Sequence, residues 1–221
     1  MLSRSPLRST LPVCRRSRAT ANGSVLIYDE TLSAFRTGPG CAQEYYGVTP
    51  DLCTLGKAVA GGFPLAAIAG REEMMAHFDP GTVETGGFVP QIGTLSGNPV
   101  AAVAGLATLA ILRREETYER LFAKGRRLKD NLQRLLDEAE IPARVVGDEP
   151  LFDVFFTQEH VTDYRSSLAT DKRMLGRFNQ LLLERGVFKG DSKYYISTAH
   201  TEEDVDRTIE AFASAVEALR G

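Results

Sequence analysis

The sequence predicts an α/β fold, in which helices alternate with the strands of a parallel sheet. Two observations lead to this prediction. Short uninterrupted apolar runs recur from Val25 onward, and such runs are typical of strands that are buried on both faces of a parallel sheet. The segment between the first two runs is also longer than about a dozen residues, which a parallel connection requires.

The first part of the chain supplies this sheet. Its expected elements are a strand at 25–30 (VLIYDE), a helical segment at 40–47, and strands at 51–57 (DLCTLGK) and 64–70 (PLAAIAG). A long helix should follow within 96–112, because Asn98 is a suitable N-cap and Pro99 a suitable first helical residue. This helix is apolar nearly all round, which predicts that it is buried.

In the remaining residues, 117–221, strand-like segments alternate with helical ones in a different pattern, which predicts a smaller α+β domain. Thr201 and Asp204 form a capping box for the last helix, and Gly186 suits the end of the helix before it. The expected helices span 117–140, 171–186 and 201–220, and the expected strands span 143–147, 151–157 and 193–197.

Composition excludes several classes of function. The chain has 221 residues, of which 43% are hydrophobic and 25% charged, as in an ordinary soluble globular protein. A net charge of -3 and the lack of a basic stripe exclude nucleic acid as a partner, and no apolar run is long enough to cross a membrane. The three cysteines and three histidines show no metal-binding or disulfide spacing, which favours a reducing compartment and predicts no metal site.

Residues 1–24 differ from the rest, with five arginines, five serines and no acid. This composition is typical of a mitochondrial transit peptide. The alternative, which we favour because the globular pattern begins abruptly at Val25, is an upstream region translated from a wrong start. We therefore expect a non-globular segment at 1–24 and a cytoplasmic protein, or a mitochondrial one if the segment is a genuine transit peptide.

Two charged residues stand at the ends of neighbouring strands. Asp29 ends the first strand and Lys57 the second, so both should face the crevice at the carboxyl ends of the sheet. A plain salt bridge between them is one interpretation. A nucleotide-binding P-loop is excluded, because Asp51 and Ala58 occupy the positions where that motif needs a glycine and a serine or threonine.

A second interpretation is a pyridoxal phosphate (PLP) site. A lysine that forms a Schiff base with an aldehyde must be available as a free amine, and the apolar neighbours of Lys57 would favour that form. The ring nitrogen of PLP needs a nearby acid, for which Asp29 is the candidate. Gly93 and Thr94, with Ser96, precede the long helix and could hold the phosphate, although that motif alone could be merely a helix cap.

Four motifs occur in one order: LIYDETLSAFR, YYGVTPDLCTLGK, GTLSGNP and STAHTEEDV. Together they resemble class III PLP-dependent aminotransferases, most of all the glutamate-1-semialdehyde 2,1-aminomutase branch, from about Val25 to the C-terminus. The resemblance implies an aspartate-aminotransferase-like fold (PLP fold type I) and a homodimer that acts on a small amino acid or amino-aldehyde. It also implies that Lys57 forms the Schiff base, that Asp29 pairs with the ring nitrogen, and that Thr94 contacts the cofactor phosphate of the neighbouring subunit.

The chain also departs from the family pattern. Thr31 and Ala34 stand where the family usually has valine and glycine, and the stretch GDSKYYIS lacks the glutamate of the aminomutases, which favours an aminotransferase. The motifs of the family's N-terminal half are not found before Asp29. We therefore expect the C-terminal half of such an enzyme, with 25–116 from the large PLP-binding domain and 117–221 as the small domain. Alternatives are a catalytically incomplete fragment and a plain α/β binding module.

Overall fold

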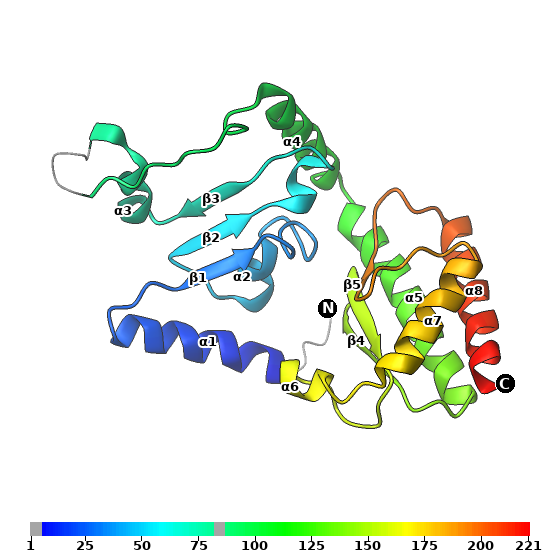
Figure 1. The fold of residues 1–221 in the computed structure, drawn as a ribbon. Helices are drawn as coiled ribbons and strands as arrows, with labels where there is room; N and C mark the ends of the chain where they lie inside the picture. Colours follow the sequence, from blue (N-terminus) through cyan, green and yellow to red (C-terminus); the bar gives the residue numbers. More distant parts are fainter. Residues whose placement is uncertain (1–5, 82–86) are drawn as a thin grey trace. The chain divides into compact units, whose positions relative to one another are not determined.

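The structure, a computed structural model, describes residues 6–81 and 87–221, with side chains described from residue 14 onward. The chain forms two compact units, Met1–Glu115 and Glu116–Gly221 (Figure 1). The fold is mixed α/β, as the sequence predicts, and each unit carries its own sheet.

The first unit contains the strands β1 (Ile27–Glu30), β2 (Leu52–Leu55) and β3 (Ala67–Gly70), which form one sheet in this order. β1 and β2 are parallel, as predicted, and β3 returns antiparallel to β2. The other elements of this unit are the helices α1 (Pro6–Ala21), α2 (Cys41–Tyr46), α3 (Glu72–Met75) and α4 (Pro99–Leu112), and the 3-10 turns η1 (Lys57–Ala60) and η2 (Ala76–Phe78).

The segment expected to be non-globular forms a helix. α1 lies beside the sheet and packs against α2 (Figure 1). The guanidinium of Arg16 lies 2.6 Å from the carboxylate of Asp51, which also pairs with Arg71 at 3.0 Å and accepts the N–H of Leu26 at 2.8 Å. The arginines of this segment therefore include a specific partner of a buried acid.

Asp51→Asn is expected to lower the midpoint of thermal unfolding by several degrees at neutral pH. Hydrogen bonds from Arg16, Leu26 and Arg71 hold the pKa of Asp51 well below its ordinary value. A carboxyl with a lowered folded-state pKa stabilises the fold above its ordinary pKa, and this contribution is lost as the pH falls towards the folded-state value. Variant and wild type should therefore differ most at about pH 7 and converge below about pH 4.

Circular dichroism melts at a series of pH values would measure this difference. Asp191→Asn, which changes an exposed aspartate of the second unit, is the matched control and should leave the midpoint unchanged. A midpoint for Asp51→Asn equal to that of the wild type near neutral pH would contradict the structural role of Asp51.

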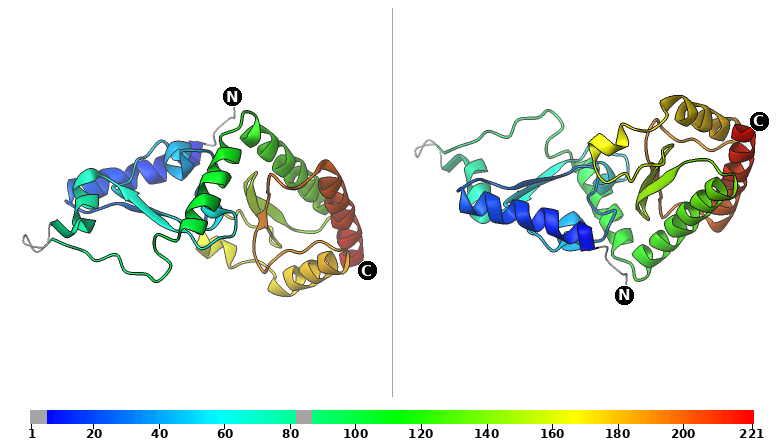
Figure 2. Two further views of the ribbon diagram at one scale, coloured as in Figure 1. Left: turned by 90° about the horizontal axis from the view of Figure 1, so that it is seen from above. Right: turned by 90° about the horizontal axis from the view of Figure 1, so that it is seen from below.

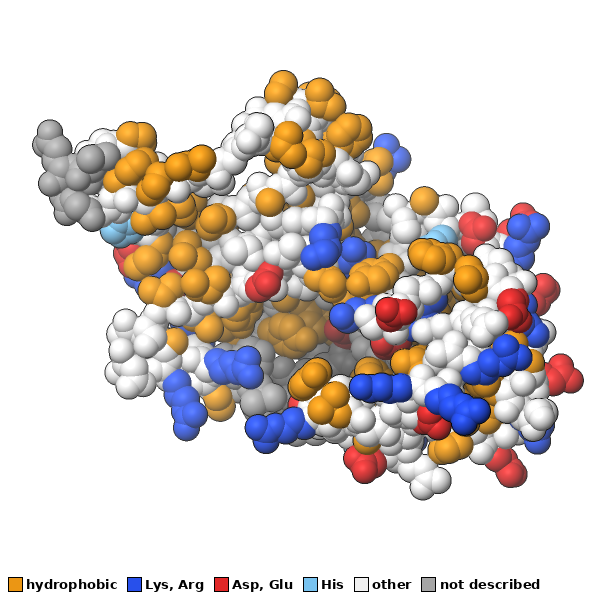
Figure 3. Space-filling model, viewed as in Figure 1, with side chains coloured by type: hydrophobic (Ala, Val, Ile, Leu, Met, Phe, Trp, Pro, Cys, Tyr) orange, Lys and Arg blue, Asp and Glu red, His pale blue; other side chains and the backbone are white. Residues whose placement is uncertain are grey.

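The apolar surface of the first unit is more exposed than the sequence predicts. All four residues of β3 are exposed, and α4 buries only Ala101 and Gly105, while Val103 and Leu106 are 65% and 69% exposed. Figure 3 shows hydrophobic side chains gathered on the surface over α4. The prediction of a buried helix is therefore wrong for the described residues, because apolar composition shows that a helix can be buried but not what covers it.

The start of α4 agrees with the prediction from its sequence. Asn98 is the N-cap and Pro99 the first helical residue. The side chain of Asn98 accepts the N–H groups of Val100 at 2.9 Å and Ala101 at 3.3 Å. The cap therefore satisfies two of the backbone donors that a helix start otherwise leaves free.

The second unit is an α+β layer structure. Its strands β4 (Arg144–Asp148), β5 (Leu151–Phe155) and β6 (Tyr194–Tyr195) form an antiparallel sheet in this order. Its helices are α5 (Thr117–Glu138), α6 (Tyr164–Ser167), α7 (Lys172–Glu184) and α8 (Glu202–Arg220). α8 packs against both α5 and α7, and the three helices stand along the sheet (Figure 2).

The core of the second unit lies between these helices and the sheet. Its fully buried side chains come from α5, β5, α7 and α8 and include Leu132, Leu136, Phe152, Val154, Phe178, Leu182 and Phe212. Gly125 lets α5 pack closely against the backbone at Glu149, because a Cβ on residue 125 would lie 1.9 Å from the carbonyl oxygen of Glu149. The predicted capping box of Thr201 and Asp204 is present at the start of α8, and Gly186 follows α7 with a φ of 79°.

Candidate active site

The parallel pairing of β1 with β2 sets the positions of the two predicted residues. Asp29 lies in β1 directly opposite Thr54 of β2. Lys57 begins η1, just beyond the end of β2. Because the strands run in the same direction, Asp29 and Lys57 stand at the same edge of the sheet, as the sequence predicts.

Asp29 is held through one of its two carboxylate oxygens. Oδ1 accepts the backbone N–H of Thr31 at 3.0 Å and the hydroxyl of Thr54 at 3.0 Å. Hydrogen bonds from the side chain and N–H of Thr31, then from Thr54, lower the pKa of Asp29, and the charge of Lys57 acts in the same direction. The carboxylate is therefore ionised at neutral pH, and among the described residues Oδ2 is left for a further donor.

Lys57 occupies a backbone conformation that is uncommon for a residue with a side chain. Its φ is 49°, in the left-handed region, and such outliers concentrate at functional sites. Val59 and Ala60 are buried and anchor the turn, whereas Lys57 is exposed. The partly desolvated setting that its neighbours predicted is not found, because the apolar residues of the turn point inward and leave the lysine outside.

Gly56 gives the turn its close fit to the sheet. A Cβ at this position would lie 3.0 Å from Cγ2 of Thr31, which is tighter than ordinary packing. The residue before Lys57 therefore brings the turn up against the segment that follows Asp29.

A hollow of about 500 Å³ lies on the same side of the sheet as the two threonines. Besides Thr31 and Thr54, its lining comes from Leu55, from β3 and the residue before it, from α3 with η2, and from Gln91, Ser96 and Gly97. The loop that precedes α4 therefore reaches the neighbourhood of Asp29.

The predicted phosphate residues belong to this loop. Gly93 accepts the N–H of Ser96 at 3.0 Å, and the hydroxyl of Ser96 donates to Gln91 at 3.3 Å. Gly93 and Thr94 are exposed, and they are not among the residues that line the hollow. The structure thus places this loop near the candidate site, with Gly93 and Thr94 exposed and outside the hollow.

Thr54 is the site residue that sequence reasoning missed. Nothing in its local pattern sets it apart from the other residues of its strand. The signal lies in the register, because only the pairing of β1 with β2 puts its hydroxyl beside Asp29.

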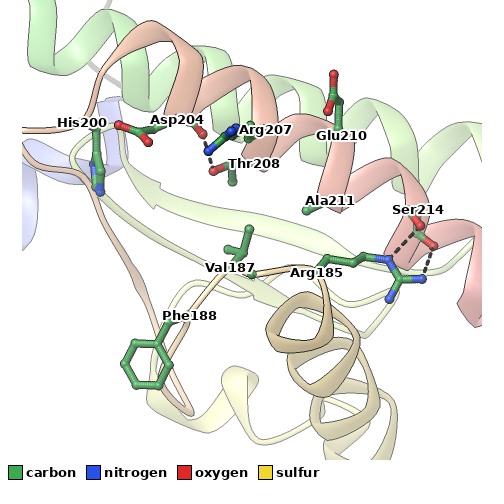
Figure 4. Close-up of a pocket in the computed structure, with 11 residues that line it drawn as sticks. Arg185, Val187, Phe188, His200, Asp204, Arg207, Thr208, Glu210, Ala211 and Ser214 are labelled. Carbon is green, nitrogen blue, oxygen red and sulfur yellow. Dashed lines mark hydrogen bonds between the residues drawn. The ribbon is translucent and has the colours of Figure 1, made fainter.

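A second, larger hollow of about 810 Å³ lies in the second unit, between α8 and the segment 185–188 (Figure 4). Its two arginines already have partners. Arg185 donates to Ser214 at 2.7 Å, and Arg207 lies 3.3 Å from Glu203. It holds neither Asp29 nor Lys57, and so it is not the candidate active site.

Among residues 6–81 and 87–221, no three histidines, cysteines or acids are grouped so that they could bind a metal ion. In the same ranges, none of the helices combines the length and apolar character that spanning a membrane requires.

Comparisons with known proteins agree with this geometry. The family model for aminotransferase class-III matches residues 14–216, so the match begins within the segment expected to lie outside the globular part. The glutamate-1-semialdehyde 2,1-aminomutases of Methanosphaera stadtmanae and Methanopyrus kandleri are 40% and 43% identical to the chain, over 201 and 200 residues. These matches cover 90% and 89% of the chain but 46% and 45% of the relatives, so the chain spans about half their length.

Solved structures show the same relationship. An omega-transaminase from Sphaerobacter thermophilus has a TM-score of 0.86 at 36% identity, over 95% of this chain and 48% of its own. A β-phenylalanine aminotransferase from Variovorax paradoxus has a TM-score of 0.83 at 29% identity, over 92% and 46%. A transaminase solved with PLP bound has a TM-score of 0.79 at 32% identity, over 92% and 46%. Motifs, fold and comparisons agree: the chain belongs to the class-III aminotransferase family.

Proposed function

We propose that this chain takes part in PLP-dependent transfer of an amino group, with Lys57 as the residue that forms the Schiff base. The substrate would be a small amino acid or amino-aldehyde. The observation that carries the proposal is an ionised Asp29 with one open oxygen, set at the same sheet edge as an exposed primary amine. The family match over residues 14–216 supports the same chemistry.

The residues present fit this cofactor. Asp29 offers Oδ2 as an acceptor for a protonated ring nitrogen, and an adjacent negative charge keeps that nitrogen protonated. Lys57 offers an amine at the end of a neighbouring strand. The loop that holds Gly93 and Thr94 offers a hydroxyl and backbone N–H groups of the kind that bind phosphate.

When bound, PLP supplies a ring that accepts the electrons released at the substrate's α-carbon. The protein's own residues then have separate tasks. The Asp29 carboxylate holds the proton at the ring nitrogen. The Lys57 amine would remove and return the proton at the substrate carbon, as a general base and acid.

We further propose a homodimer in which Thr94 contacts the cofactor phosphate of the neighbouring subunit. The exposed position of Thr94, outside the hollow beside Asp29, supports this arrangement. The same branch of the family includes aminomutases, and the missing glutamate in GDSKYYIS favours simple amino transfer.

The alternative is a catalytically incomplete fragment of such an enzyme. Two observations favour it: the chain spans about half the length of its relatives, and β3 and α4 leave apolar side chains exposed. Exposed strands and apolar faces also promote aggregation. We therefore expect this chain alone to take up the cofactor but to turn over little or no substrate.

The test is a PLP titration of residues 1–221, followed by visible absorbance and then by addition of a panel of amino acids. A saturable absorbance change that Lys57→Ala lacks would support the proposal. Absorbance without consumption of any amino donor would favour the fragment. No change beyond that of free PLP would contradict a PLP site in this chain.

A further inference from the structure

Asp29 lies among hydrogen-bond donors that reach only one of its oxygens. The N–H of Thr31 and the hydroxyl of Thr54 both lie 3.0 Å from Oδ1. The Thr54 bond crosses from β2 to β1 at the position where the two residues are paired in register. It therefore fixes the carboxylate to the neighbouring strand as well as to its own.

The direction of these hydrogen bonds follows from the chemistry of the groups. An ionised carboxylate can only accept, so the Thr54 hydroxyl must give its proton to Asp29. The oxygen of Thr54 then accepts, and the hydroxyl of Thr31 lies 3.2 Å from it. Thr31 thus supports the orientation of the Thr54 hydroxyl, in addition to donating its N–H to Asp29.

We propose that Thr54 is a positioning residue for the cofactor: its hydroxyl holds Oδ1 of Asp29 and so reserves Oδ2 for the ring nitrogen. The inference rests on the proposed PLP function and adds two residues to it. Thr54 acts directly on Asp29, and Thr31 acts both on the carboxylate and, through its hydroxyl, on Thr54. A carboxylate held on one oxygen by two donors keeps its charge and one orientation, which is what a ring nitrogen requires of its partner.

Few other groups near Asp29 could orient its carboxylate. Lys57 is the charged group whose field acts on Asp29. Glu30, the next residue of the strand, is buried and accepts the N–H of Ala42 at 2.6 Å at the start of α2. Successive side chains of a strand face opposite sides of the sheet, so Glu30 lies on the opposite face from Asp29.

Three variants separate these roles. Thr54→Val removes the hydroxyl but keeps a β-branched residue that suits a strand. Thr54→Ser keeps the hydroxyl and is the matched control. Thr31→Val keeps the N–H that Asp29 accepts and removes the hydroxyl of Thr31.

The first measurement needs no cofactor. Carbon-13 NMR follows the titration of the Asp29 carboxyl, assigned with Asp29→Asn, in the chain alone. The pKa of Asp29 should rise towards its ordinary value in Thr54→Val and in Thr31→Val, and stay unchanged in Thr54→Ser. An unchanged titration in a folded Thr54→Val protein would overturn the proposal.

The second measurement is PLP affinity from the visible titration. Thr54→Val should weaken binding about tenfold, because it removes a hydrogen bond to a charged group, and Thr54→Ser should restore it. Equal affinity in wild type and Thr54→Val would overturn the positioning role while the proposed function stands. Absence of PLP binding in the wild type would overturn both.

Discussion

Borohydride reduction of the PLP-loaded chain is expected to leave the pyridoxyl group on Lys57. Peptide mass spectrometry after digestion would locate it. Lys57 is exposed and stands at the sheet edge beside Asp29, so a bound cofactor whose ring nitrogen meets Asp29 has this amine within the same site. We expect one labelled peptide, which contains Lys57, at a yield that follows cofactor occupancy.

Two other lysines sharpen this test because their amines are already engaged. Lys189 has a side chain only 1% exposed, and its amine lies 3.2 Å from Asp153. Lys124 donates to the backbone carbonyl of His200. A label on either of these residues would contradict the assignment of Lys57.

Lys57→Arg should abolish both the label and turnover of any amino donor. Arginine keeps the positive charge near Asp29 but provides no amine that can condense with an aldehyde. In any assembly that is active, the rate of proton transfer at the substrate carbon should fall on the order of 10⁴-fold. Lys172→Arg, on the exposed surface of α7, is the matched control and should leave label and rate unchanged.

The sequence predicted those parts of the fold that depend on local patterns. The pairing of β1 with β2 follows from two apolar runs and a long connection, and the start of α4 follows from Asn98 and Pro99. α1 was not predicted, because the acid that pairs with Arg16 lies far along the chain, on the sheet. No local pattern shows a long-range ion pair of this kind.

Some residues of the candidate site could be predicted from the sequence, and others could not. Asp29 and Lys57 could be found because the ends of adjacent parallel strands meet at one edge of a sheet. Thr54 could not, because its role depends on the strand register. The exposure of Lys57 could not be predicted either, since it follows from a turn in which Val59 and Ala60 face inward.

Asp29→Asn is expected to separate attachment of the cofactor from its use. Asparagine has nearly the same shape and can still accept the N–H of Thr31, but it carries no charge to keep a ring nitrogen protonated. Reduction should therefore still label Lys57, while proton removal from the substrate, followed by exchange of the α-hydrogen for deuterium, falls roughly 100-fold. Asp29→Ala should behave alike and also lose the link between β1 and β2 that the Thr54 hydroxyl provides. Exchange at the wild-type rate in Asp29→Asn would show that Asp29 pairs only within the protein. Loss of the Lys57 label would show instead that Asp29 is needed for the cofactor to bind at all, and the division of labour between the two residues would have to be redrawn.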